Sequence, residues 1–167
     1  MIQMNNILVA TDFGEAADAA LAYGRTLART FGATLHVVHV AENVMMRNAG
    51  LGGESYVMLL PDLQRDIEDA ARKQLDERLI DNDRPPIRTK SDVLTSIGPA
   101  QSIVEYAKNN NVDLVVIGTH GRAGLARLFM GSVAERVVRT APCPVLTVHH
   151  PEHEFVLPDA LVATAKA

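Results

Sequence analysis

Residues 118–132 read G-T-H-G-R-A-G-L-A-R-L-F-M-G-S and lie between an apolar run at 113–117 and a helix-like run at 133–139. The pattern predicts a buried strand, a glycine-bearing loop and a helix. A glycine permits a sharp turn and close approach of a ligand to the backbone, because it has no Cβ. The first N–H groups of a helix lack intrahelical partners and lie at the positive end of its dipole. The stretch is therefore a candidate phosphate site.

The glycine spacing does not fit two common phosphate-binding motifs. No Gly-Lys-Ser/Thr follows at the spacing of a Walker A loop, and the Gly-x-Gly-x-x-Gly fingerprint of dinucleotide-binding folds does not match either. Two residues separate Gly118 from Gly121, nine separate Gly121 from Gly131, and Ser132 follows directly. Glycines that only turn the chain would produce part of the same pattern.

Length and composition indicate a globular chain with one core. The chain has 167 residues, of which 47% are apolar and 22% are charged, and one cysteine, Cys143, which excludes an internal disulfide. The net charge of −4 and the aromatic content of 4% argue against a nucleic acid as the main partner. No apolar run approaches the roughly eighteen residues of a membrane span, and no signal peptide is visible. We therefore expect a cytoplasmic protein without a membrane partner.

Short apolar runs alternate with helical patterns along the chain. Asp62 is the expected N-cap of a helix, and residues 41–61 before it are the longest predicted irregular stretch. The alternation predicts an α/β fold with a parallel sheet and right-handed crossovers. Strands are predicted at 6–10, 34–40, 87–94, 113–117 and 144–148, and helices at 15–31, 62–79, 98–108 and 133–139.

The glycine spacing resembles the nucleotide-binding signature of the ATP-binding branch of the universal stress proteins. An opening strand that ends Ala-Thr-Asp at 10–12 and a closing Pro-Cys-Pro-Val-Leu-Thr-Val segment at 142–148 are also similar to that family. The resemblance covers roughly residues 4–149. It implies a Rossmann-like, open twisted five-stranded sheet in the order 3-2-1-4-5, with helices on both faces. It also implies one nucleotide-binding domain at 1–150, and residues 151–167 are expected to form a C-terminal tail that extends beyond the family pattern.

That strand order would place the ends of the first and fourth strands side by side, where ligands of open parallel sheets bind. Asp12 ends the first strand, and the residues alone leave two roles equally open: an N-cap for the next helix or a contact to a nucleoside. The resemblance favours the nucleoside contact and includes the neighbouring Thr11. It further implies that the backbone of Val40 pairs with the adenine edge.

The phosphates are expected at the glycine loop and the mouth of the helix that follows it. Ser132 and Glu135 match a capping box, which needs no ligand, although the same hydroxyl could also donate to a phosphate. Arg122, Arg127 and His120 would offset the charge of Glu135. The candidate phosphate-binding residues are Gly118, His120, Gly121, Arg122, Gly131, Ser132 and Val133.

No nucleophile–base pair, paired carboxylates or zinc-ligand spacing is visible, so no catalytic residue or metal ligand is assigned. The resemblance implies an ATP-binding regulatory protein of the stress response, with slow hydrolysis or none. Mg²⁺ or Mn²⁺ is the candidate ion that would bind the phosphates. The protein is expected to form a homodimer in which the last strand makes the interface. Two alternatives stay open: a structural or chaperone-like dimer that binds no nucleotide, and a slow ATPase or nucleotidyl transferase on the same fold.

Overall fold

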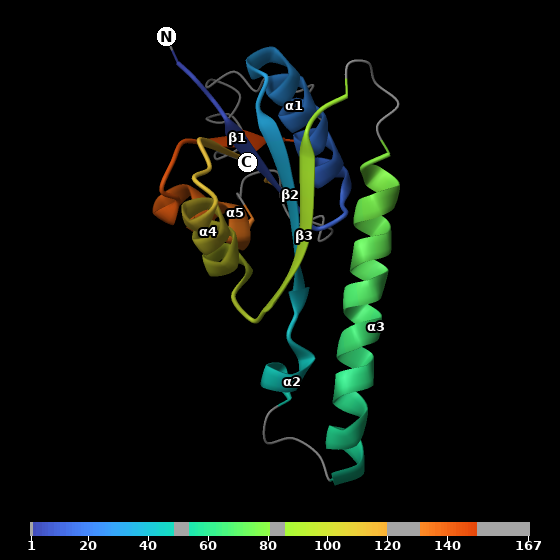
Figure 1. Ribbon diagram of the computed structural model, residues 1–167. Coiled ribbons are helices and arrows are strands. Elements are labelled where there is room, and N and C mark those ends of the chain that lie inside the picture. Colours follow the sequence, from blue (N-terminus) through green and yellow to red (C-terminus); the bar gives the residue numbers. More distant parts are fainter. Residues whose placement is uncertain (1, 49–53, 81–85, 120–130, 150–167) are drawn as a thin grey trace, which may run out of the picture.

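The computed structural model describes residues 2–48, 54–80, 86–119 and 131–149 (Figure 1). Five parallel strands form one sheet in the order β3-β2-β1-β4-β5. The fold class and the strand order expected from the sequence are confirmed, and the predicted tail at 151–167 lies outside the described residues. The strands are β1 Asn6–Thr11, β2 Thr34–Glu42, β3 Thr89–Ser96, β4 Leu114–Gly118 and β5 Val145–Val148.

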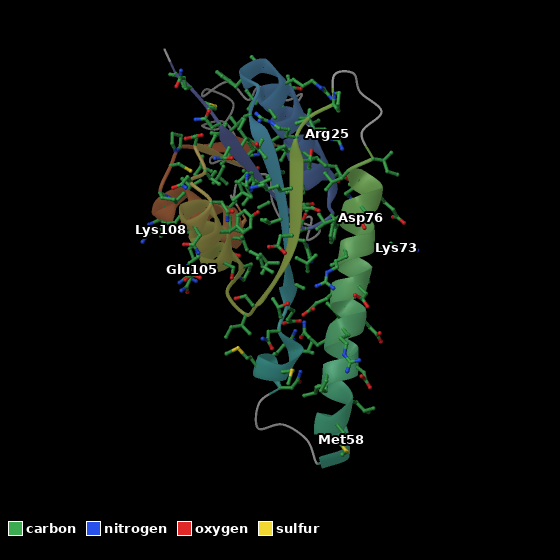
Figure 2. All side chains as sticks on the ribbon, viewed as in Figure 1. Arg25, Met58, Lys73, Asp76, Glu105 and Lys108 are labelled. Atoms are coloured by element: carbon green, nitrogen blue, oxygen red, sulfur yellow. The ribbon has the colours of Figure 1, made fainter. Side chains whose placement is uncertain are left out.

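Helices cover both faces of the sheet. Helices α1 and α3 pack on one face, whereas α4 and α5 pack on the other (Figure 1). Figure 2 shows Glu105 and Lys108 on the outer side of α4, and Lys73 on the side of α3 that points away from the sheet. The described helices are α1 Glu15–Phe31, α2 Val44–Arg47, α3 Glu54–Arg78, α4 Pro99–Asn109 and α5 Ser132–Thr140.

Strand β1 lies at the centre of the sheet and is buried on both faces. Ile7, Leu8 and Val9 are 0% exposed. Ile7 and Val9 contact the layer of α1 and α3, and Leu8 contacts the layer of α4 and α5. A strand buried on both sides needs a continuous apolar sequence, which is why the run at 6–10 was recognisable as a central strand.

The prediction for the second helix was wrong at its start. Asp62 is not an N-cap, because α3 already begins at Glu54 and contains Pro61. Leu60 and Gln64 are buried on either side of the exposed Pro61, so inward packing favours a continuous helix despite the missing N–H of the proline. Asp62 instead pairs with Arg65 at 3.1 Å.

Part of the stretch predicted to be irregular is helical for a tertiary reason. Asn43 caps α2 by accepting a hydrogen bond from the N–H of Met46 at 2.9 Å. The side-chain oxygen of Gln64 accepts a second one from the N–H of Val44, also at 2.9 Å. The short helix α2 is therefore completed by a residue of α3, which local sequence patterns do not reveal.

His36 is a buried titratable residue of β2, with an exposed fraction of 1%. Its ring nitrogens lie 3.1 Å from the hydroxyl of Tyr106 and 3.3 Å from the side-chain oxygen of Asn6. Burial first, and then the charge of Lys90 on the neighbouring strand, lower the pKa of His36 below its ordinary 6.5. The folded protein therefore keeps this ring neutral below the pH at which the unfolded chain binds a proton.

We expect this histidine to make stability depend on pH. Its contribution is complete above about pH 6.5 and is lost as the pH falls through that value toward the lower pKa of the folded state, by at most about 1.4 kcal/mol per pH unit. Urea unfolding at about pH 7.5 and about pH 5.5 measures the loss. The loss should be smaller in His36→Gln, and an equal loss in both proteins would contradict the assignment.

Candidate functional site

A pocket of about 330 Å³ lies at the carboxyl ends of β1 and β4, where the winding of the sheet reverses. Open parallel sheets bind ligands at such a point. Seven of the predicted binding residues line it: Thr11, Asp12, Val40, Gly118, Gly131, Ser132 and Val133. The other three, His120, Gly121 and Arg122, lie outside the described residues. Segments about a hundred residues apart in the sequence thus contribute to one pocket, as the strand order requires.

The turn after β1 brings Asp12 to the wall of the pocket. Gly14, not Asp12, is the N-cap of α1, so the helix-capping interpretation of Asp12 was wrong. One carboxylate oxygen of Asp12 accepts a hydrogen bond from the N–H of Gly14 at 2.9 Å. The hydroxyl of Thr11 accepts one from the N–H of Phe13 at 3.0 Å. Two short local bonds therefore shape the turn, and the Asp12 side chain stays exposed to a ligand.

His39 also lines the pocket, although it was not among the binding residues predicted from the sequence. Its Nδ1 lies 2.9 Å from the carbonyl oxygen of Thr11, which can only accept, so Nδ1 carries a proton. Its ring stacks on Phe13 with centroids 4.3 Å apart. No local signal separated His39 from the core histidine His36 on the same strand, because only the sheet pairing places one of them beside the pocket.

Gly118 is required by packing between a strand and a helix. A Cβ at this position would lie 2.6 Å from the carbonyl carbon of Ala16, 2.7 Å from its oxygen and 2.9 Å from the nitrogen of Ala17. These are backbone atoms of the first turn of α1, which cannot move aside as a flexible side chain would. This contact is sufficient to explain the glycine, whether or not a phosphate approaches it.

The predicted capping box at the start of α5 is not formed. Gly131 occupies the N-cap position and Ser132 is the first helical residue, so the serine hydroxyl is one position too late to act as the cap. The carboxylate of Glu135 instead pairs with Arg139 at 2.9 Å. This pairing turns the negative charge of Glu135 along the helix, toward its C-terminal end.

The first amides of α5 are available at the pocket. The N–H groups of Ser132, Val133 and Ala134 lie in the first turn, where a helix offers them no acceptor. Within the described part of the chain, neither these groups nor the Ser132 hydroxyl has a hydrogen-bond acceptor. All three residues line the pocket. An anion at this position would meet backbone donors and the positive end of the helix dipole.

Thr119 is a further lining residue that the sequence did not single out. It is 1% exposed, and its hydroxyl lies 2.7 Å from Nδ1 of His149 and 3.3 Å from the carbonyl oxygen of Val148. The carbonyl oxygen of Thr119 accepts a hydrogen bond from the N–H of Gly131 at 2.8 Å. Thr119 thereby joins the end of β4 to both β5 and the start of α5, and keeps the pocket wall together.

The described residues contain no group of three or more histidine, cysteine or acidic residues that could hold a metal ion by itself. None of the helices they form has the length and apolar character needed to cross a membrane.

A model of the universal stress protein family matches residues 4–149. The chain belongs to this family. Universal stress protein MJ0531 of Methanocaldococcus jannaschii is 31% identical over 148 residues, which cover 89% of this chain and 84% of the relative. The structure of universal stress protein UspA from Lactobacillus plantarum superposes with a TM-score of 0.75 at 26% identity, and the match covers 89% of this chain and 99% of that one.

Two more distant structures of this universal stress protein fold contain nucleotides. A universal stress protein in complex with cAMP has a TM-score of 0.57 at 19% identity, over 89% of this chain and 98% of that one. The universal stress protein from Archaeoglobus fulgidus in complex with dAMP has a TM-score of 0.53 at 21% identity, over 89% and 99%. At these identities the likeness shows a shared fold.

Proposed function

We propose that this universal stress protein binds an adenine nucleotide, with ATP as the ligand, in the pocket between β1 and β4. The observation that carries the proposal is the start of α5, where three backbone amides without acceptors among the described residues line a pocket of about 330 Å³. Two proteins of the same fold bind cAMP and dAMP, which supports an adenine nucleotide as the class of ligand.

The phosphates would lie against α5. Its amides supply hydrogen bonds, and the Ser132 hydroxyl adds a donor that is not used for capping. Hydrogen bonds to an anion are shorter and stronger than those between neutral groups. Because Glu135 pairs with Arg139, its carboxylate opposes a bound phosphate less than the sequence suggested.

The nucleoside would lie toward β1 and β2. The second carboxylate oxygen of Asp12 can accept from a ribose hydroxyl while the first holds Gly14. The pairing of β1 with β2 ends at Thr11 and His39, so Val40 lies beyond the last residue that β1 covers. Val40 lines the pocket at this point, and we expect its backbone to contact the adenine edge.

A Mg²⁺ or Mn²⁺ ion would enter as part of a metal–ATP complex. Asp12 is the only carboxylate among the described residues that line the pocket. Hard divalent ions need six or more oxygen ligands, so phosphate oxygens and water would have to supply most of them. Among the described residues, the pocket has no second carboxylate that could position a nucleophilic water, which favours a regulatory protein with slow hydrolysis or none over an efficient ATPase.

We further infer a homodimer formed through β5. This strand is the last of the sheet, and Val145, Leu146 and Thr147 are only half-buried. An edge strand with apolar side chains can pair with the same strand of a second copy about a two-fold axis. Sedimentation as a monomer would contradict this inference.

The single domain at 1–150 and the cytoplasmic location stay predictions of the sequence.

Ser132→Ala tests the nucleotide site without disturbing the fold. The side chain is exposed and makes no capping bond, so the free energy of unfolding should stay within about 0.5 kcal/mol of the parent protein. Loss of a hydrogen bond to a charged phosphate should weaken ATP binding about tenfold to a hundredfold. Isothermal titration calorimetry measures both proteins.

Ser91→Ala is the matched control, because Ser91 is an exposed serine of β3 and does not line the pocket. It should bind ATP like the parent protein. If the Ser132→Ala variant bound ATP as tightly as the Ser91→Ala variant, the proposed position of the phosphates at the start of α5 would be contradicted.

A further inference from the structure

Phe13 has an unusual backbone conformation beside the proposed nucleoside contact. Its φ of +64° lies in the left-handed region, which bulky residues rarely adopt. Phe13 follows Asp12 directly, and its conformation is part of the turn that holds Asp12 at the pocket wall. Such a conformation costs free energy and persists only where the surrounding structure holds it.

Two side chains from other elements hold the ring of Phe13. The ring of His39, on β2, stacks on it with centroids 4.3 Å apart and an angle of 26° between the planes. The guanidinium carbon of Arg78, on α3, lies 4.9 Å from the Phe13 ring centroid, a distance at which a cation and an aromatic face attract.

Arg78 also holds the backbone of the same turn. One Nη donates to the carbonyl oxygen of Phe13 at 3.1 Å, and Nε donates to the carboxylate of Asp18, in the first turn of α1, at 2.8 Å. The carbonyl oxygen of Arg78 in turn accepts a hydrogen bond from Arg25 at 2.6 Å. The Arg78 guanidinium is thus hydrogen-bonded both to the turn after β1, through Phe13, and to the helix that follows it, through Asp18.

We propose that Arg78 is a positioning residue for nucleotide binding, which acts by holding Phe13 in its left-handed conformation so that Asp12 faces the nucleoside. The proposal rests on the proposed function, because it assigns Arg78 to the same site. Arg78 does not line the pocket. Its effect on a ligand passes through the turn of residues 11–14, and the phosphate end at α5 is left unchanged.

The test is a double-mutant cycle on ATP affinity in the full chain, measured by titration calorimetry at a temperature where circular dichroism shows every variant folded. Arg78→Met keeps the length of the side chain and removes the guanidinium; Arg78→Lys takes its place in the cycle if Arg78→Met does not fold. Arg72→Met is the matched control, because Arg72 lies on α3 in an exposed ion pair with Asp69. We expect Arg78→Met to weaken ATP binding about tenfold, the size of one hydrogen bond to a charged group, and Arg72→Met to leave it unchanged.

The double-mutant cycle shows whether Arg78 influences ATP affinity through Asp12 or through Ser132. In an Asp12→Ala background, Arg78→Met should weaken binding further by less than about twofold, whereas in a Ser132→Ala background it should still weaken binding about tenfold. Unchanged affinity in Arg78→Met, or the same loss in both backgrounds, would overturn the positioning role while leaving nucleotide binding intact. Failure of the parent protein to bind ATP would overturn the proposed function and the positioning role with it.

Discussion

The Gly118→Ala variant is expected to lose a large part of the stability of the protein, although only one methyl group is added. The new Cβ would lie 2.6 to 2.9 Å from three backbone atoms of Ala16 and Ala17. The end of β4 or the start of α1 would have to move, and Ile117, Ala17 and Gly118 all line the pocket beside this contact. Overpacking typically costs about 1–3 kcal/mol, and rigid backbone neighbours place this site at or above about 3 kcal/mol.

Urea unfolding followed by circular dichroism measures this loss, with Gly98→Ala as the control. Gly98 is the N-cap of α4, and a Cβ there would have its nearest neighbours at 4.0 Å. The control should stay within about 0.5 kcal/mol of the parent protein. If both variants were equally stable, packing against α1 would not be the reason for the glycine at 118.

ATP is expected to raise the melting temperature by roughly 5–11 °C. A ligand that binds only the folded state adds about 2.7 kcal/mol at a hundred times its Kd. For a chain of this length, each kcal/mol shifts the melting temperature by about 2–4 °C. A thermal melt monitored by fluorescence, with ATP, ADP and AMP in turn, measures the shift and ranks the three nucleotides.

Gly131→Val should abolish this shift. A Cβ at Gly131 would lie 3.2 Å from the carbonyl oxygen of Thr119. We expect the two further methyl groups of valine to obstruct access to the amides at the start of α5. Gly98→Val places the same side chain at the N-cap of α4 and should keep the shift. No shift in the parent protein with any of the three nucleotides would favour a structural dimer, and a shift with rapid phosphate release would favour an ATPase.

The central part of the fold could be predicted because its signals are local. Continuous apolar runs mark β1 and β4 as buried strands, and Gly32 ends α1 in a left-handed C-cap with φ of +64°. The order of the sheet came from the family resemblance and not from these patterns. Once the order is known, the convergence of Asp12 and Gly118 on one pocket follows from the topology.

The errors have tertiary causes. Helix α3 continues past Pro61 because Leu60 and Gln64 pack inward, and Gln64 completes α2 across a gap of twenty residues in the sequence. The capping-box pattern at Ser132 matched in spacing, but the hydrogen bond from Gly131 to Thr119 sets the cap one residue earlier.

The contacts of Arg78 could not be predicted either. Arg78 and Phe13 are 65 residues apart in the sequence. Their contact depends on how the C-terminal end of α3 meets the turn after β1, and no periodic pattern encodes that meeting. The left-handed conformation of Phe13 was equally hidden, because such conformations are expected mainly at glycine and asparagine.

The most direct test of the account is an amide titration by nuclear magnetic resonance. In the ¹⁵N-labelled protein, ATP should cause saturable shifts of the backbone N–H signals of Ser132, Val133 and Ala134, together with that of Val40. All four residues line the pocket, the first three at the proposed phosphate end and Val40 at the proposed adenine end. Binding of ATP that left the three α5 amides unshifted, or that shifted signals only outside the pocket, would contradict the claim that the helix mouth holds the phosphates.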